Sequence, residues 1–313
     1  GRGGEALKRL YMAQCNDAYW HGVFGGLYLP HLRTAVYENL IKAENAALQA
    51  ASAGLAGIET KDIDADGAPE VLLRTRDLNI FVSPESGGGI YELDFRPKAI
   101  NLLNTLSRMP EGYHSKLTDA AQADSGSGAE SIHDMVLAKE KGLEEHLKFD
   151  PWQRGAFIES VLPDDTRLDD YRSSVQKELG GFRTGRYSVD IFENNGLRLS
   201  RSAVSDWGGL SVRKEILPAG KGSFSVDYAL ESAGDTGAGP TLTATFRSRL
   251  RFAVEVNLLL PCCDGPACFY RFSPETALSE DIGLGGFGEL KGITGVSIVD
   301  SFSGVEVSIE VDS

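Results

Sequence analysis

Cysteine is scarce in this sequence of 313 residues, and histidine is missing from its second half. The four cysteines are too few for a disulfide framework, and a bridge between the adjacent Cys262 and Cys263 would be strained. Together with Cys268 they have no CxxC spacing and no histidine after His146, which disfavours a zinc site. The sequence therefore predicts reduced thiols.

Excess positive charge and long apolar runs are also missing. The net charge of −14 and a pI near 4.9 disfavour nucleic acid and anionic membrane surfaces as partners, because like charges repel. No run approaches the roughly 20 apolar residues that span a bilayer, and the first residues lack the order of a secretory signal. We therefore expect a cytoplasmic protein whose partner is a neutral substrate or a cation.

Helical periodicity is confined to the first part of the chain. Residues 5–12 form an amphipathic pattern that is already running where the chain begins, which favours a piece of a longer protein. From Gly25 to about Ala51, apolar residues recur every three or four positions and predict one long helix. Those residues are Leu29, Leu32, Val36, Leu40, Ala43 and Ala47. After Asp62 the period changes to two.

Alternation of apolar and polar residues predicts β-strands in the rest of the chain. The expected strands are 70–75, 78–83, 90–95, 224–230, 250–258, 295–300 and 305–311. Turn signals at 194–196, 219–222 and 234–237 favour antiparallel pairing. The predicted fold class is mainly β with an N-terminal helical segment, divided into a helical segment at 1–57 and a β-sandwich domain at 62–313.

An irregular insertion around 98–181 interrupts the strands. Within it, residues 124–128 have the composition of a flexible loop tip, and residues 132–149 can hold a helix. The glycine-rich stretch 283–288 is interpreted as a loop between strands, because no helix follows it as a dinucleotide site requires. Trp207 either packs in the core or faces a sugar, and the sequence does not decide between them.

Polar and aromatic residues are densest between Gln14 and Arg33. A sugar site needs this mixture, because amide, carboxylate and imidazole groups hydrogen-bond hydroxyls while an aromatic face covers the ring. The candidate substrate-binding residues are Asn16, Asp17, Trp20, His21 and Gly22. In the alternative interpretation, Trp20 and Tyr28 are core anchors, His21 is buried, and Asn16 or Asp17 caps the next helix.

An acidic loop at 62–70 predicts a calcium site. Calcium prefers six to eight oxygen ligands in a flexible loop, and the candidate ligands are Asp62, Asp64, Asp66 and Glu70. The loop lacks the glutamate expected at its twelfth position, where Leu73 stands, and Glu70 is the candidate substitute. The alternative is an acidic turn that only begins a strand. A bound calcium ion would have a structural role.

The run from Ala13 to Glu44 resembles the fifth conserved region and the following helix of glycoside hydrolase family 57, especially its 4-α-glucanotransferase and α-amylase members. The likeness continues more loosely through 62–101 and 132–154, and on to Asn257. It implies a catalytic barrel first, then a helical bundle in which this chain begins, and then a galactose-mutarotase-like β-supersandwich.

The family's two catalytic carboxylates belong to the barrel, and no part of this sequence matches their motifs. The resemblance therefore implies an inactive chain that is part of a parent enzyme acting on α-1,4-glucans. It makes Asp17 a hydrogen-bond partner of a glucosyl unit and Trp20 a stacking residue, with Asn16, His21 and Gly22 in support. The implied partners are a maltooligosaccharide and the upstream barrel, and a homodimer is left open.

Two other functions compete with this interpretation. The chain can instead be a stand-alone carbohydrate-binding or scaffold module. An aldose epimerase is ranked last, because its proton transfers usually use a histidine inside the sandwich and all five histidines lie at or before His146. The sequence does not distinguish hydrolysis from transfer, nor one glucan from another.

Overall fold

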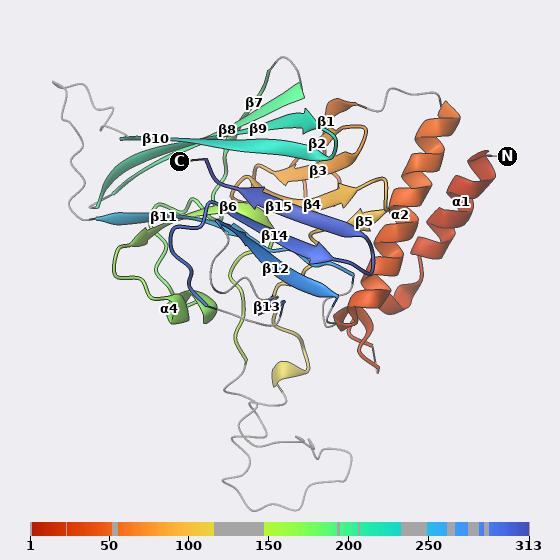
Figure 1. The fold of residues 1–313 in the computed structure, drawn as a ribbon, viewed down its shortest axis with the longest axis horizontal. Helices are drawn as coiled ribbons and strands as arrows, with labels where there is room; N and C mark the ends of the chain where they lie inside the picture. Colours follow the sequence, from red (N-terminus) through yellow and green to blue (C-terminus); the bar gives the residue numbers. More distant parts are fainter. Residues whose placement is uncertain are drawn as a thin grey trace, which may run out of the picture. The chain divides into compact units, whose positions relative to one another are not determined.

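The computed structural model describes residues 2–22, 24–51, 56–115, 147–192, 195–205, 207–232, 249–261, 267–274, 282–284 and 288–312. Several predictions lie wholly or partly outside these ranges. They are the loop tip at 124–128, the helix within 132–149, the turns at 194–196 and 234–237, the cysteine pair 262–263 and the glycine-rich stretch 283–288. The described chain is mainly β, with antiparallel sheets and few helices, as predicted (Figure 1). No described helix combines the length and apolar character needed to cross a membrane.

The chain divides into two compact units, which are described separately. The first unit comprises Gly1–Leu55, Leu93–Asn104 and Leu258–Ser313. The second comprises Ala56–Glu92 and Thr105–Asn257.

Two helices in series begin the first unit, as the periodicity predicts. Helix α1 (Arg2–Ala13) lies beside α2 (Pro30–Ala51), and the short helices η1 (Asn16–Ala18) and η2 (Gly26–Tyr28) lie between them in sequence (Figure 1). Helix α2 begins five residues later than predicted. Gly25 and Gly26 have φ of 112° and 48°, outside the right-handed helical region, and Pro30 then suits the first helical position.

Polar contacts fix α2 within the first unit. Arg9 of α1 donates from Nη1 to Asn39 Oδ1 at 3.2 Å. Near the other end of α2, Asn45 Oδ1 accepts from Nε and Nη2 of Arg96 at 2.9 and 2.7 Å. Arg96 is buried, so this contact replaces hydration that the guanidinium lost on folding.

A four-stranded antiparallel sheet completes the first unit. Its order is β13 (Ile282–Gly283), β12 (Cys268–Ser273), β14 (Gly295–Asp300) and β15 (Val305–Glu310). The last two match the predicted strands at 295–300 and 305–311. The buried Asp300 closes the turn between them, because its Oδ1 accepts from the backbone N–H groups of Phe302 and Ser303, each at 3.0 Å.

A longer antiparallel sheet begins just after the helical segment. Its order is β1 (Gly57–Lys61), β2 (Glu70–Arg74), β3 (Leu78–Ser83), β4 (Gly89–Phe95), β6 (Ala156–Pro163) and β11 (Leu250–Val256), and β5 (Ile100–Asn101) pairs with β4. Strand β11 ends two residues before the predicted limit. A register shift between Glu255 and Val256 breaks the ladder there.

A second sheet of four strands belongs to the second unit. Its order is β10 (Ser223–Ser232), β9 (Gly208–Gly220), β8 (Gly196–Ser205) and β7 (Ser188–Phe192), and the short helix α4 (Leu168–Arg172) lies outside both sheets. Apolar side chains from the strands of this unit are fully buried and form its core. They include Leu73, Ile80, Ile90, Leu197, Leu199 and Ile216.

One ion pair lies inside that core. On β9, Lys214 occupies the buried alternate position between Val212 and Ile216. Its Nζ contacts Glu159 Oε2 at 2.8 Å and donates to the backbone oxygen of Phe157 at 2.9 Å. Burial raises the pKa of Glu159 and lowers that of Lys214, while the attraction between them opposes both shifts.

Candidate functional site

The loop between α1 and α2, residues 14–29, displays the predicted sugar-binding residues. Asn16, Asp17 and His21 are exposed, and Trp20 is 45% exposed. Tyr28 is 43% exposed, so neither aromatic residue is a core anchor. Asn16 and Asp17 lie inside η1, whose N-cap is Cys15, and therefore do not cap it. The alternative interpretation of this cluster does not fit these positions.

Backbone contacts give the 14–29 loop a defined shape. The backbone oxygen of Trp20 accepts from the N–H of Leu27 at 2.8 Å, which folds the loop back on itself. The phenol of Tyr19 donates to the backbone oxygen of Ala13 at 2.7 Å, which ties the loop to the end of α1. The rings of Trp20 and His21 meet edge to face with centroids 5.3 Å apart. The exposed side chains of Trp20 and His21 thus lie next to each other on a loop whose backbone is fixed by hydrogen bonds.

Gly26 allows this fold, and its replacement by alanine is expected to disrupt it. A Cβ at residue 26 would lie 2.1 Å from the backbone oxygen of Trp20, and φ there is +48°. We expect Gly26→Ala to lower the free energy of unfolding by about 1–3 kcal/mol, because the loop must open or strain. Urea unfolding measures the loss. Gly4→Ala is the matched control, because a Cβ there meets nothing within 4 Å. Equal stability of both variants would contradict the packing described.

The acidic loop brings three of its four predicted ligands together. One oxygen from each of Asp62, Asp64 and Glu70 lies within 4.8 Å of the others. Asp66 lies outside this group, and its Oδ1 accepts from the N–H of Ala68 at 2.7 Å. The buried Glu70 reaches the loop from β2, and its Oε2 accepts from the N–H of Ile63 at 2.9 Å.

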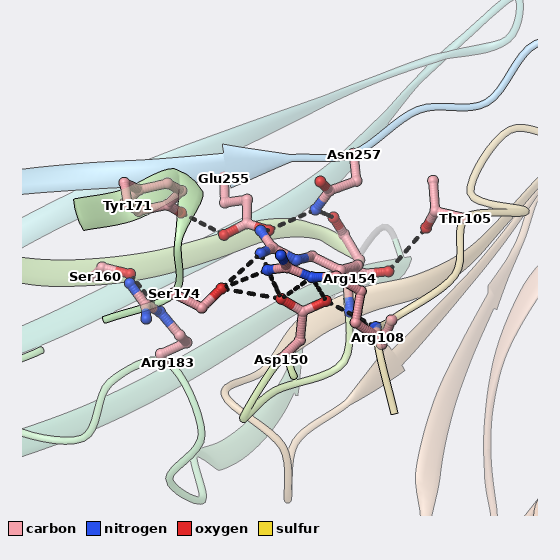
Figure 2. A network of polar contacts seen from close by, with 12 residues as sticks. Thr105, Arg108, Asp150, Arg154, Ser160, Tyr171, Ser174, Arg183, Glu255 and Asn257 are labelled. Atoms are coloured by element: carbon pink, nitrogen blue, oxygen red, sulfur yellow. Dashed lines mark hydrogen bonds and ion pairs between the residues drawn. The ribbon is translucent and has the colours of Figure 1, made fainter. Parts of the chain in front are cut away.

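A third polar cluster, in the second unit, was not predicted from the sequence. At its centre, the carboxylate of Asp150 accepts hydrogen bonds from Arg108, Arg154 and Ser174 (Figure 2). The side chain of Asp150 is only 2% exposed. Burial alone would raise the pKa of Asp150, but these hydrogen bonds outweigh it and hold the pKa well below its ordinary value. Asp150 therefore stays ionised at neutral pH.

Glu255 forms the second half of the same network (Figure 2). It accepts from Arg154 Nη1 at 2.7 Å, from Asn257 Nδ2 at 2.7 Å and from the hydroxyl of Tyr171. Burial raises the pKa of Glu255, and these bonds more than reverse the rise, so its pKa is lowered. Burial, together with the charge of Glu255, raises the pKa of Tyr171.

Two arginines flank one tryptophan beside the network. The guanidinium carbons of Arg154 and Arg183 lie 4.7 and 3.9 Å from the ring centroid of Trp152. Both carboxylates of the cluster are buried and fully engaged, so neither is placed to exchange protons with a substrate at neutral pH. The network joins distant segments of the second unit and is structural in character.

The described residues form a mainly antiparallel β protein with an exposed cluster of polar and aromatic side chains on the loop between α1 and α2. Residues 62–313 match the family model described as alpha-amylase/4-alpha-glucanotransferase, C-terminal. Residues 2–47 match the model described as alpha-amylase/4-alpha-glucanotransferase, middle domain. The chain therefore belongs to this family, glycoside hydrolase family 57, and corresponds to its part outside the barrel. The resemblance seen in residues 13–44 is confirmed.

Curated relatives agree with this assignment. The chain is 34% identical over 301 residues to alpha-amylase 1 of Dictyoglomus thermophilum, a match that covers 94% of this chain and 40% of that protein. It is 37% identical over 254 residues to the 4-alpha-glucanotransferase of Thermococcus kodakarensis, covering 81% and 35%. The crystal structure of the 4-alpha-glucanotransferase from Thermococcus litoralis matches with a TM-score of 0.68 and 26% identity, covering 99% of this chain and 39% of that one. The chain thus spans at most 40% of these relatives' lengths.

Proposed function

We propose that this chain is the non-catalytic part of an enzyme acting on α-1,4-glucans, and that residues 16–22 form one wall of its glucan site. The observation that carries the proposal is the exposure of Trp20 beside Asp17 and His21 on a loop of defined backbone. The names of the relatives, alpha-amylase and 4-alpha-glucanotransferase, supply the substrate class.

Each residue of the cluster has a proposed role that follows from its chemistry. Asp17 accepts hydrogen bonds from glucose hydroxyls, and Trp20 covers the C–H face of a glucose ring. Asn16 and His21 add hydrogen bonds, and Gly22 lets the backbone approach the ligand closely. The remaining wall and the two carboxylates that cleave the bond come from an upstream barrel.

The β part of the chain is proposed to support this site. We assign residues 1–57 to a helical segment and 62–313 to a β-supersandwich of galactose-mutarotase-like type. The two antiparallel sheets of the second unit, with a buried apolar core, support this assignment.

Calorimetric titration with maltoheptaose tests the proposal against the stand-alone binding module. The chain alone is expected to bind with a dissociation constant weaker than about 1 mM, because half of the pocket is missing. The longer enzyme is expected to bind at least about tenfold more tightly and to lose that gain in Trp20→Ala. Micromolar binding by the chain alone, unaffected by Trp20→Ala, would support the module instead.

We also propose a structural calcium ion at the acidic loop. Three carboxylates within 4.8 Å repel one another, and a divalent cation would neutralise that repulsion. One oxygen of each group accepts a backbone N–H, from Gly67 to Asp62, from Asp66 to Asp64 and from Ile63 to Glu70. A carboxylate has two oxygens, so this pattern is compatible with a ligand set that includes backbone carbonyls and water.

Calcium is expected to raise the thermal midpoint by about 2–5 °C relative to EDTA, because it binds only the folded loop. Glu70→Gln should abolish this increase, since it removes the charge that reaches the loop from β2. Glu59→Gln is the control: it removes an exposed carboxylate from the neighbouring β1 and should leave the increase intact. A calcium response that survives Glu70→Gln would contradict the proposed ligand set.

A further inference from the structure

Arg33, in the first turns of α2, joins two parts of the first unit that are far apart in sequence. Its Nε donates to Asn104 Oδ1 at 3.0 Å and its Nη2 donates to the backbone oxygen of Asn104 at 3.1 Å. Its Nη1 donates to the backbone oxygen of Leu27 in η2. A planar guanidinium can hold three such acceptors at once, whereas a single ammonium cannot do so with the same geometry.

Leu27 carries this connection to the glucan-binding cluster. Its oxygen is held by Arg33, and its N–H donates to the oxygen of Trp20 at 2.8 Å. One bond uses the backbone oxygen of Leu27 and the other uses its N–H. Arg33 therefore restrains the backbone of Trp20 through Leu27. Gly26 lets the two arms of this loop approach closely, since a Cβ at residue 26 would lie 2.1 Å from the oxygen of Trp20.

Asn104 provides a firm anchor for the arginine. It is buried, and its Nδ2 donates to Thr34 Oγ1 at 3.2 Å, so its amide contacts two consecutive residues of α2. Asn104 ends the segment Leu93–Asn104, which belongs to the same compact unit as the helices. Upstream in that segment, the N–H of Leu102 donates to the oxygen of Leu93 at 2.8 Å.

We propose that Arg33 and Asn104 are positioning residues for the glucan-binding cluster, acting through Leu27 on Trp20. This inference rests on the proposed function for its biological meaning. Arg33 lies in the part of the chain that matches the middle-domain model, and Asn104 lies in the part that matches the C-terminal model. A residue of the C-terminal part, Asn104, would therefore help to position the glucan-binding cluster at residues 16–22 of the middle-domain part.

Fluorescence quenching of Trp20 by acrylamide tests the positioning directly in this chain. The sequence has three tryptophans, and Trp20 is the exposed one, since Trp152 and Trp207 are 6% and 8% exposed. Arg33→Lys is expected to raise the quenching constant of Trp20 by about 1.5–2-fold, because the loop opens locally while the core stays folded. Trp20→Phe supplies the background from the two buried tryptophans.

Two variants separate positioning from a loss of stability. Arg9→Lys also removes an arginine contact to α2, with Asn39, and should leave the quenching of Trp20 unchanged. Asn104→Asp keeps an acceptor for Arg33 and should behave like the original chain, whereas Asn104→Leu should match Arg33→Lys. If Arg33→Lys and Asn104→Leu leave the quenching unchanged, the positioning role is overturned.

Glucan binding distinguishes this inference from the proposed function. In the longer enzyme, Arg33→Lys is expected to raise the KM for maltoheptaose several-fold and to change kcat by less than about twofold. This pattern is expected when a variant weakens the binding of substrate and transition state equally. If Arg33→Lys raises the quenching of Trp20 but neither Arg33→Lys nor Trp20→Ala weakens glucan binding, the positioning role is supported and the proposed function is wrong.

Discussion

Replacing Lys214 with methionine is expected to lower the free energy of unfolding by about 3–5 kcal/mol. The side chains of Lys214 and Glu159 are both fully buried, and their charged atoms are 2.8 Å apart. Methionine has a similar length but no charge, so the variant leaves the carboxylate of Glu159 in the core without its cation. Urea unfolding at pH 7 measures the loss.

Two further variants separate the ion pair from simple packing. In Lys214→Met with Glu159→Leu, both charges are absent, and most of the lost stability should return. Arg213→Met, at the neighbouring outward position, removes the ion pairs of a side chain that is 45% exposed and should cost less than about 1 kcal/mol. A double variant as unstable as Lys214→Met would show that the core needs the shape of these side chains rather than their pairing.

The Lys214→Met variant should also gain relative stability in acid. Burial raises the pKa of Glu159 in the folded state, and removal of Lys214 removes a charge that opposed this rise. A carboxyl whose folded pKa is raised contributes stability at low pH and loses it as the pH rises through the folded pKa. The loss in free energy of unfolding that Lys214→Met causes should therefore be smaller at pH 4 than at pH 7.

Asp150→Asn is expected to cost about 3 kcal/mol at pH 7, because it removes the buried charge that Arg108 and Arg154 share. The pKa of Asp150 is held below its ordinary value in the folded protein. Its stabilising contribution is thus present above the unfolded pKa of about 3.9, and is lost as the pH falls towards the folded pKa.

Unfolding measured between pH 2 and pH 7 checks both parts of this prediction. The Asp150→Asn variant should lose less stability below about pH 4 than the original chain does. Asp169→Asn, at an exposed carboxylate of α4, is the control and should cost less than about 1 kcal/mol. Parallel acid profiles for the original chain and Asp150→Asn would mean that Asp150 does not stabilise the folded state through its charge.

Local periodicity predicts only part of the regular structure, because β6 (Ala156–Pro163) lies inside the stretch 98–181 that was expected to be irregular. Strand β3 has the predicted limits of 78–83, and β14 has the predicted limits of 295–300. The acidic loop was recognised from residue spacing, since its predicted ligands lie within nine residues of one another in sequence. The loop carboxylates that lie together in space are thus also close along the chain.

The polar networks could not be predicted, because their partners are distant in sequence. Lys214 looks like one more surface charge between Arg213 and Glu215 until Glu159, 55 residues away, is placed opposite it. Arg154 and Glu255 are separated by 101 residues. No local period reports such pairings. Glu159 lies on β6 and Lys214 lies on β9, which belong to different sheets, so only the tertiary fold brings them together.

The exposed cluster at 16–22 was located from the sequence, and its role as a sugar site stays a prediction. The type and spacing of residues 16–22 pointed to a sugar, but they left the buried alternative open until the exposure of Trp20 and His21 was known. The contacts of Arg33 with Asn104 and Leu27 could not be foreseen, because an arginine in an amphipathic helix resembles any solvated charge.

A crystal structure of the longer enzyme with a bound maltooligosaccharide tests the central claim most directly. It should place a glucose ring against the indole of Trp20, with a ring hydroxyl about 2.5–3.2 Å from the carboxylate of Asp17. A sugar bound in the catalytic barrel with Trp20 and Asp17 both out of reach of every ring would contradict the account.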